Sequence, residues 1–257
     1  MFIARDGAAA ERDRITRTRP DGSKASWRPY FGRTPGSATG GELEAIKTDP
    51  ELNAILEPQV YLVEQPSEKI FQPHFHFVDQ FQLVTAGEGS IGRHAVRPFS
   101  VHFASAFTGY GPITATQNGI DYLTIRARTE ITGAHFLPDS KSDIRPGLKR
   151  NVIVNDIDLA ELESKSRPAD TVVVTYTSEP DGLAIMLMRV GSSMSATMAL
   201  LVEGGGRCIV VLTGHVHCRG DVYGPLSVLF SSAGEGPLSL TADEAGANLL
   251  LLQFPRG

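Results

Sequence analysis

Short apolar segments separated by polar turns run along most of the chain. They are bounded by Gly, Pro, Asn or Asp, which is typical of strands in an all-β barrel or sandwich. Helical patterns are few: residues 41–55, and residues 157–164 after a capping Asn155 or Asp156. The strands are predicted at residues 59–63, 71–77, 81–85, 101–106, 122–126, 171–176, 183–190, 196–202, 208–213, 227–232 and 249–254.

The chain also resembles itself at an offset of 127 residues. Residues 100–106 (SVHFASA) align with residues 227–233 (SVLFSSA), with five of seven positions identical. Agreement of strands and turn glycines at one offset indicates two copies of one structural unit. The same offset pairs Gly87 with Gly214, Gly119 with Gly246, and residues 122–126 with 249–253.

The repeat predicts a barrel at residues 55–128 and a second at residues 182–257, joined by a connector at residues 129–181. Residues 1–54 are polar and predict a partly ordered N-terminal arm, with Trp27, Tyr30 and Phe31 as the cluster that pins it to a folded body. Basic residues outnumber acidic ones over the first part of this arm, which allows an anion-binding role as well as a solvated extension.

Composition narrows the class of partner. There are 24 Lys and Arg against 29 Asp and Glu, so the formal net charge of −5 offers no basic surface for nucleic acid. No apolar run approaches the roughly 20 residues of a membrane span, and the first residues lack the core of a signal peptide. We expect a soluble cytoplasmic protein, in which Cys208 and Cys218 are free thiols.

The strongest chemical signal is the segment PHFHFVDQ at residues 73–80. On a strand, side chains two residues apart point to the same face, so His74 and His76 would lie side by side with Cα atoms about 6.6 Å apart. Imidazole nitrogens bind divalent metals at roughly 2 Å. The pair therefore predicts a metal site, which the amide oxygen of Gln80 completes or borders.

His74-x-His76, followed by Gln80 and, after six further residues, by Gly87, resembles the first motif of the cupin superfamily. The family motif has Glu where this chain has Gln80. The resemblance implies a small β-barrel, and the internal repeat then implies a bicupin with its metal motif in the N-terminal copy and a degenerate C-terminal copy. It further implies one divalent metal per chain, with Fe(II) favoured and Mn, Ni or Zn as alternatives.

A third metal ligand is harder to place. At the position where the second cupin motif brings a histidine, this chain has Tyr110. His102, on the preceding strand, could supply the third nitrogen or could be an ordinary barrel histidine bonded to backbone. The phenol of Tyr110 could bind the metal or donate to a bound substrate. We expect a surface role for His94.

The second copy provides an internal control for these positions. The offset places Leu201 on His74, Glu203 on His76, Arg207 on Gln80 and Leu229 on His102. No metal site is therefore expected in the C-terminal barrel. The apolar replacements indicate that the positions of His74 and His102 face the barrel interior.

Three functions are compatible with this site. A metal held by neutral imidazoles keeps positions open for substrate or dioxygen, which favours a non-haem Fe(II) dioxygenase. The alternatives are a metal-dependent isomerase or lyase and a non-catalytic small-ligand-binding bicupin. Because Gln80 carries one negative charge fewer than Glu, we expect a small enolic, aromatic or anionic organic substrate that supplies this charge itself.

The expected site has His74, His76 and His102 as metal ligands and Gln80 and Tyr110 as the catalytic groups that orient the substrate. Apolar residues on the predicted barrel faces also lead us to expect a homodimer.

Overall fold

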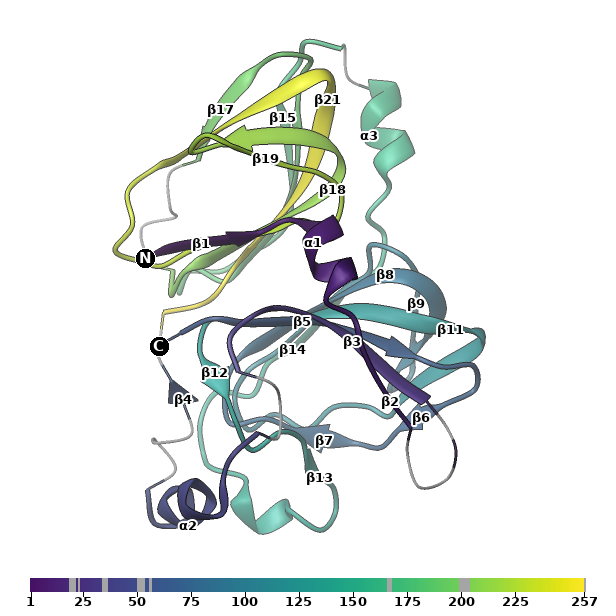
Figure 1. Cartoon of the computed structure of the whole chain (residues 1–257), viewed down its shortest axis with the longest axis vertical. Coiled ribbons are helices and arrows are strands. Elements are labelled where there is room, and N and C mark those ends of the chain that lie inside the picture. The colour runs from purple at the N-terminus through teal and green to yellow at the C-terminus, as the bar shows by residue number, and fades with distance from the viewer. Residues whose placement is uncertain are drawn as a thin grey trace. The chain divides into compact units, whose positions relative to one another are not determined.

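The structure is a computed structural model that describes residues 1–18, 22, 24–33, 37–49, 54–55, 57–165, 168–198 and 204–256. It divides into two compact units (Figure 1). Arg14–Asp156 form one unit, the N-terminal barrel. Met1–Asp13 and Ile157–Gly257 together form the other, the C-terminal barrel.

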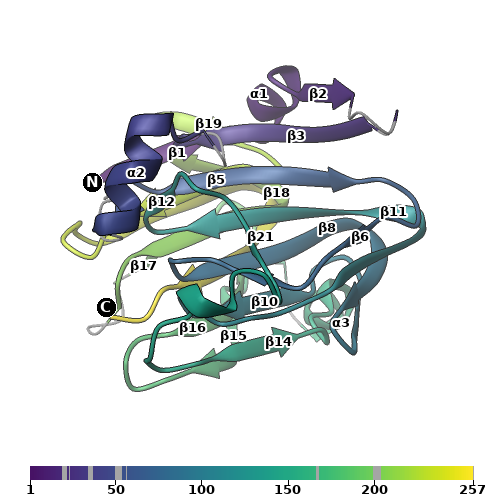
Figure 2. The same cartoon turned by 90° about the horizontal axis from the view of Figure 1, so that it is seen from below.

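The N-terminal barrel is built on an antiparallel sheet that is nine-stranded among the described residues. Figure 2 shows the order β14-β10-β8-β11-β5-β3 across this sheet; β2 follows β3, β6 pairs with β11, and β9 pairs with β8. Its strands are β2 (Ile15–Thr18), β3 (Lys24–Phe31), β5 (Gln59–Gln65), β6 (Ile70–Phe71), β8 (Gln80–Ile91), β9 (His94–Val96), β10 (Val101–Ala104), β11 (Ile113–Arg126) and β14 (Asn151–Val154).

Two short strand pairs lie outside this sheet. β4 (Ala54–Ile55) pairs with β12 (Thr129–Glu130), and β7 (His74–Phe75) pairs with β13 (His135–Phe136). The second pair matters for function because it holds the first histidine of the motif.

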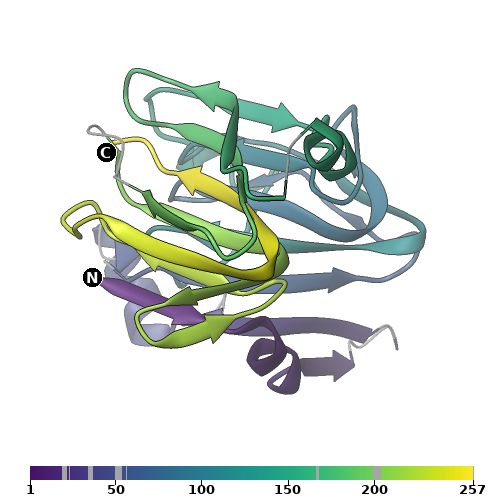
Figure 3. The same ribbon diagram turned by 90° about the horizontal axis from the view of Figure 1, so that it is seen from above.

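The C-terminal barrel repeats this architecture with an eight-stranded sheet among the described residues, in the order β1-β20-β18-β21-β16-β15 (Figure 3). β17 pairs with β21 and β19 pairs with β18. The strands are β1 (Phe2–Arg5), β15 (Val172–Ser178), β16 (Ala184–Val190), β17 (Ser195–Met198), β18 (Arg207–Cys218), β19 (Asp221–Tyr223), β20 (Val228–Ser231) and β21 (Leu238–Gln253).

Helices are short and few in the described part of the chain: α1 (Gly7–Arg12), α2 (Gly40–Thr48), α3 (Leu159–Lys165) and a 3₁₀ turn at Lys141–Asp143. A capping box starts α2, because the Thr39 hydroxyl accepts from the Glu42 amide while the Glu42 carboxylate accepts from the Thr39 amide. None of these helices has the length and apolarity needed to cross a membrane.

The predicted repeat of 127 residues is confirmed strand by strand. β8, β9 and β10 have the same bounds as β18, β19 and β20 once the offset is applied. The all-β fold class with two related barrels is therefore confirmed.

The turn glycines of the two copies adopt the same backbone conformation. Gly87 has φ +69° and Gly214 has φ +74°, a region that L side chains rarely adopt. A Cβ at Gly87 would also lie 2.2 Å from the carbonyl oxygen of Gly119, and one at Gly214 would lie 2.0 Å from that of Gly246. Only glycine fits this bend of the long hairpin.

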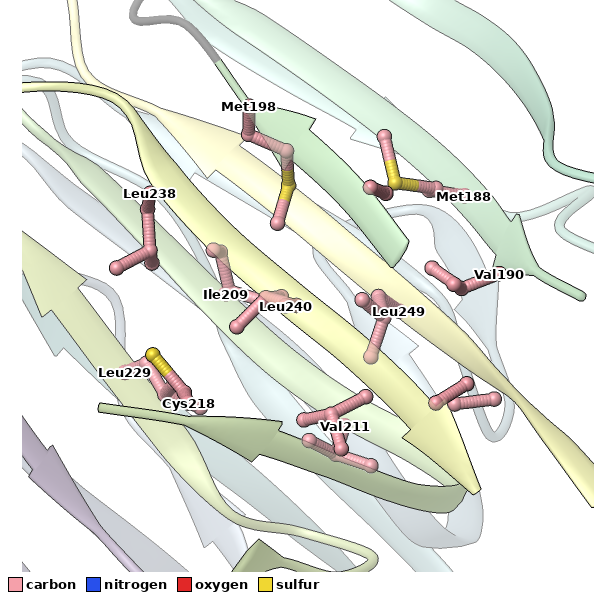
Figure 4. Close-up of a cluster of buried hydrophobic side chains, with 14 of the residues drawn as sticks. Met188, Val190, Met198, Ile209, Val211, Cys218, Leu229, Leu238, Leu240 and Leu249 are labelled. Carbon is pink, nitrogen blue, oxygen red and sulfur yellow. The ribbon is translucent and has the colours of Figure 1, made fainter. Parts of the chain in front are cut away.

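A large cluster of apolar side chains packs inside the C-terminal barrel. Figure 4 shows Ile209, Val211, Leu229 and Leu249 among the side chains that fill it, all of them buried. Leu229 occupies the place of His102, as predicted, since it pairs with Ile209 as His102 pairs with Gln82. The predicted counterparts Leu201 and Glu203 lie outside the described residues.

The N-terminal residues are distributed differently from the expected arm. β1 pairs with β20 inside the C-terminal barrel, while β3 pairs with β5 inside the N-terminal barrel. Trp27 lies opposite Val63 in this pairing, so the aromatic cluster belongs to a barrel strand. Two strands of the expected connector also belong to the sheets: β14 to that of the N-terminal barrel and β15 to that of the C-terminal barrel. The pairing of β1 with β20 joins segments far apart in the sequence, which no local pattern indicates.

Candidate functional site

A cavity of about 270 Å³ lies in the N-terminal barrel. Its walls come mainly from strands β3, β5, β8 and β11 and from the loop after β12. Most of the predicted site residues lie in this wall, and an arginine that the sequence analysis did not select joins them. The polar side chains of the wall include His74, His76, Gln80, Gln82, Tyr110 and Arg126.

The two motif histidines meet as the spacing predicts. His74 lies in β7 and His76 follows it directly, and their ring centroids are 5.2 Å apart. The predicted continuous strand is broken, however, because residues 72–73 separate β6 from β7. A bridge holds Tyr110 beside His74: the His74 amide donates to the Tyr110 carbonyl at 3.1 Å and the Tyr110 amide donates to the His74 carbonyl at 3.0 Å.

Hydrogen bonds fix the tautomers of both imidazoles. Nδ1 of His74 lies 2.8 Å from the Gln72 carbonyl oxygen, and Nδ1 of His76 lies 3.0 Å from that of Gly133. Because a carbonyl oxygen only accepts, both Nδ1 atoms carry the proton and both Nε2 atoms keep a lone pair. Burial lowers the pKa of His74 to about 3, with His76 adding to the shift, and burial also lowers the pKa of His76. Both rings are therefore neutral.

Gln80 and Tyr110, the predicted orienting groups, are brought together. Nε2 of Gln80 donates to the Tyr110 hydroxyl, whose ring packs edge-on against His74 at 4.4 Å. Burial raises the pKa of Tyr110 well above its ordinary value, so the phenol stays protonated. The amide orientation leaves the Gln80 oxygen facing a different partner.

That partner is Arg126, at the end of β11 and fully buried. Gln80 Oε1 accepts from Arg126 Nε at 3.2 Å and from Nη2 at 3.0 Å, while Nη1 donates to Gln59 Oε1 at 2.6 Å. Nη2 also lies 3.1 Å from each ring nitrogen of His76. In the plane of the ring, the position equally close to both nitrogens is taken by the Cε1–H group. The guanidinium therefore lies over the face of the imidazole.

Arg126 could have been found in the sequence. Side chains on a strand alternate, so Tyr122, Thr124 and Arg126 share one face, and all three line the cavity. An arginine on the inward face of a barrel strand is unusual enough to indicate a function.

Glu130 is a second residue that the sequence analysis missed. Its carboxylate is fully buried, with Oε2 3.0 Å from Nδ1 of His76 and Oε1 accepting from the Thr132 hydroxyl at 3.0 Å. Burial alone would raise the pKa of Glu130, but His76, His135 and Arg126 lower it, so the carboxylate is ionised. It places a negative charge beside Nδ1 of His76.

His102 lies apart from the other two histidines. Its Nδ1 is 2.8 Å from Gln82 Oε1 and its Nε2 is 3.0 Å from Asn151 Oδ1, so both nitrogens have partners. Its ring packs against Tyr110 at 4.8 Å, yet it is not among the residues that line the cavity. Burial lowers its pKa to about 4, so the ring is neutral and its single N–H donates to one of these two amide oxygens. His94, in contrast, is exposed on β9.

The complete chain resembles solved structures of two-barrel proteins. A bacterial pirin, YhhW from Escherichia coli in complex with nickel(II), matches with a TM-score of 0.55 over 100% of both chains at 14% identity. A cupin 2 conserved barrel domain protein from Leptotrichia buccalis matches with a TM-score of 0.50 over 90% of this chain and 88% of that chain, at 11% identity. The chain has the bicupin fold.

A further bicupin-like match is a putative dioxygenase from Nostoc punctiforme PCC 73102, with a TM-score of 0.62, 10% identity, and coverage of 99% of this chain and 82% of that chain. No protein-family model and no curated protein matches the sequence. At such identities the matches establish the bicupin fold and leave the reaction open.

The bicupin fold implies a divalent metal, which the side-chain donor atoms of this cavity would have to hold. The Nε2 atoms of His74 and His76 suit a metal, because their Nδ1 atoms are held by acceptors as in most metal-binding histidines. The other side chains around these two atoms do not suit a metal. Gln80 offers a neutral oxygen that already accepts from Arg126, and a permanent positive charge lies over His76. No group of three or more His, Cys, Asp and Glu that could hold a metal occurs among the described residues. The arrangement does not fit a resident divalent metal.

Proposed function

We propose that the N-terminal barrel binds a small anionic organic molecule in the cavity, with Arg126 as the group that binds its negative charge. The observation that carries this proposal is the buried guanidinium in the cavity wall. A guanidinium has five N–H groups, and three of those on Arg126 donate to glutamine oxygens. Of the other two, the one on Nη2 belongs to a nitrogen that lies against the ring of His76. The one on Nη1 is suited to a carboxylate or enolate oxygen, because charged acceptors give the strongest hydrogen bonds of this kind.

The charge balance of the cavity supports an anion. Its charged lining consists of Arg17, Lys69 and Arg126 against one carboxylate, Glu64. Glu64 is already paired, since one of its oxygens lies 2.8 Å from Arg14 and 2.7 Å from Arg28. The lining is therefore cationic in excess, although Glu130 compensates part of this charge from behind His76.

The rest of the wall favours a flat organic molecule. Trp27, Tyr61, Phe71 and Tyr122 line the cavity, and aromatic rings pack well against planar ligands. A volume of about 270 Å³ lies just below the roughly 300 to 1,000 Å³ that is usual for drug-sized ligands, so the molecule is small. Neutral His74 and protonated Tyr110 then offer an acceptor and a hydroxyl beside the anion.

Calorimetric titration of the full chain with small aromatic carboxylates, each compared with its neutral amide of the same shape, tests the proposal. Arg126→Gln should weaken carboxylate binding at least about 30-fold, as expected for loss of one partner of a buried charge pair, and should bring the carboxylate and amide to similar affinities. Arg93→Gln, at an exposed turn arginine, is the control. Equal affinity of native protein and Arg126→Gln for every carboxylate that binds would contradict the proposal.

The Fe(II) dioxygenase that the sequence predicts would depend on the lone pairs on Nε2 of His74 and His76, and the other donors of the site weigh against it. The isomerase or lyase alternative depends on the same two atoms. When bound, such a metal would supply a site for dioxygen or for substrate oxygens. Anaerobic addition of Fe(II) followed by titration with nitric oxide distinguishes this candidate: a nitrosyl signal that is lost in His74→Ala with His76→Ala would establish an iron site, and no signal would leave metal-independent ligand binding.

A further inference from the structure

We infer that the guanidinium of Arg126 replaces a metal as the buried cation of this barrel, and that Gln80 and Arg126 together keep divalent metals off His74 and His76. The inference concerns the barrel's own residues and holds whichever ligand binds. It rests on two observations, one in each barrel.

The first observation is the use of the donor atoms in the N-terminal barrel. The oxygen of Gln80, which aligns with the glutamate of the cupin motif, is turned toward Arg126 and accepts from two of its nitrogens. The same guanidinium lies 3.1 Å from the nitrogens of His76. A divalent ion on these donors would sit close to a charge that cannot be removed by deprotonation, in a buried site where like charges repel strongly.

The second observation is the same pair of residue types in the C-terminal barrel, with the strands exchanged. Arg207 and Gln253 are Cα partners on β18 and β21, and the 127-residue offset aligns them with Gln80 and Arg126. Arg207 is 2% exposed and donates to the Met198 carbonyl at 3.1 Å. Each barrel thus buries one guanidinium and one glutamine at the same cross-strand position, so the arginine is a constant part of this architecture.

Substitutions at positions 80 and 126 can test whether the charges of these two residues control metal binding. Gln80→Glu alone would place a carboxylate against Arg126, and the resulting ion pair should leave no affinity for metal. Gln80→Glu combined with Arg126→Gln removes the cation and supplies the carboxylate. That double variant should then offer two neutral imidazoles and one anionic oxygen, which is a common ligand set for divalent transition metals.

The test is metal content and thermal stability of the native full chain and of both variants. Each protein is incubated with excess Ni(II) and, separately, anaerobic Fe(II), desalted and analysed for metal. We expect less than about 0.1 equivalent in the native chain and in Gln80→Glu, and about one equivalent in the double variant, together with a Ni(II)-dependent rise of its Tm. Adding His74→Ala to the double variant should abolish both effects.

Two results would overturn the inference. One is a native chain that already retains about one equivalent of metal through His74 and His76. The other is a double variant that binds no metal, whether it folds without metal or stays unfolded in the presence of both ions. A double variant that folds only with Ni(II), and not with Mg(II), supports the inference, because metal binding then supplies the stability.

This outcome is separable from that of the proposed function. A native chain that binds no carboxylate, combined with metal uptake by the double variant, would refute the proposed function and leave the inference standing. Carboxylate binding by a native chain that also retains metal would do the reverse.

Discussion

The guanidinium of Arg126 lies over the imidazole of His76, with Nη2 3.1 Å from each ring nitrogen. On its Nδ1 edge the same ring holds the carboxylate of Glu130 at 3.0 Å. A neutral ring therefore contacts both a buried cation and a buried anion. Such charges are stable in the interior only as a set, because each one loses its compensation when the other is removed.

Arg126→Met should therefore destabilise the protein by about 3 to 5 kcal/mol, since it leaves Glu130 as an uncompensated buried charge and removes the guanidinium donors from the oxygens of Gln59 and Gln80. Urea denaturation measures this. Combining Arg126→Met with Glu130→Gln should cost less than the sum of the single changes, by about 0.5 to 3 kcal/mol. Strict additivity of the two changes would show that the residues do not act on one another.

The buried histidines make stability fall in mild acid. Burial lowers the pKa of His74 to about 3 and that of His102 to about 4, whereas in the unfolded chain both titrate near 6.5. Below about pH 6.5 the unfolded state binds protons that the folded state does not bind, so the free energy of unfolding is complete above that pH and decreases as the pH falls toward 4.

The size of this effect is testable by urea unfolding at about pH 7, 6 and 5. Each of these histidines contributes a slope of up to about 1.4 kcal/mol per pH unit. His102→Gln removes one such group and should give a shallower dependence than the native chain. A free energy of unfolding that is constant between about pH 7 and 5 would show that the imidazoles are not held neutral.

Tyr110→Phe removes the hydroxyl that accepts from Gln80 and leaves that buried amide without its partner. We expect a loss of about 1 to 3 kcal/mol in stability and weaker binding of the carboxylate ligand, because Gln80 also orients Arg126. Tyr223→Phe, in the other barrel, is the matched control and should leave ligand affinity unchanged. Unaltered affinity in Tyr110→Phe would remove Tyr110 from the site.

The shared hairpin bend predicts equal sensitivity in both copies. Gly87→Ala and Gly214→Ala should each cost more than about 2 kcal/mol, because both combine positive φ with a backbone oxygen in the way of the new methyl group. Gly234→Ala meets no atom within 4 Å and should change stability by less than about 0.5 kcal/mol. A tolerated substitution at Gly87 would contradict the repeat as a structural constraint.

The sequence predicts the barrels well because their signals are local or repeated. Strand β8 contains several apolar residues, and its counterpart in the second copy, β18, follows at a fixed offset. The two copies therefore support the same strand prediction. The edge strand β1 is different. It has only four residues, and nothing local indicates that it pairs with β20 at the other end of the chain.

In the site, too, the features with local sequence signals were predicted and others were missed. The pairing of His74 with His76 follows from a two-residue spacing, and the contact of Gln80 with Tyr110 agrees with the predicted orienting pair. Arg126 was missed although its alternation with Tyr122 and Thr124 on β11 indicates an inward face. The role of Glu130 depends on its contact with His76, which is a relationship between distant segments. The assignment of His102 as a ligand stays a prediction, and its bonds to Gln82 and Asn151 give its nitrogens other partners.

A crystal structure of the native chain with a bound aromatic carboxylate, grown in the presence of Ni(II), tests the central claim most directly. We expect the carboxylate oxygens to lie within hydrogen-bond distance of the Arg126 guanidinium, inside the cavity, and no metal to be bound to His74 or His76. A nickel ion on the Nε2 atoms of both histidines, with the carboxylate bound to that ion, would contradict it.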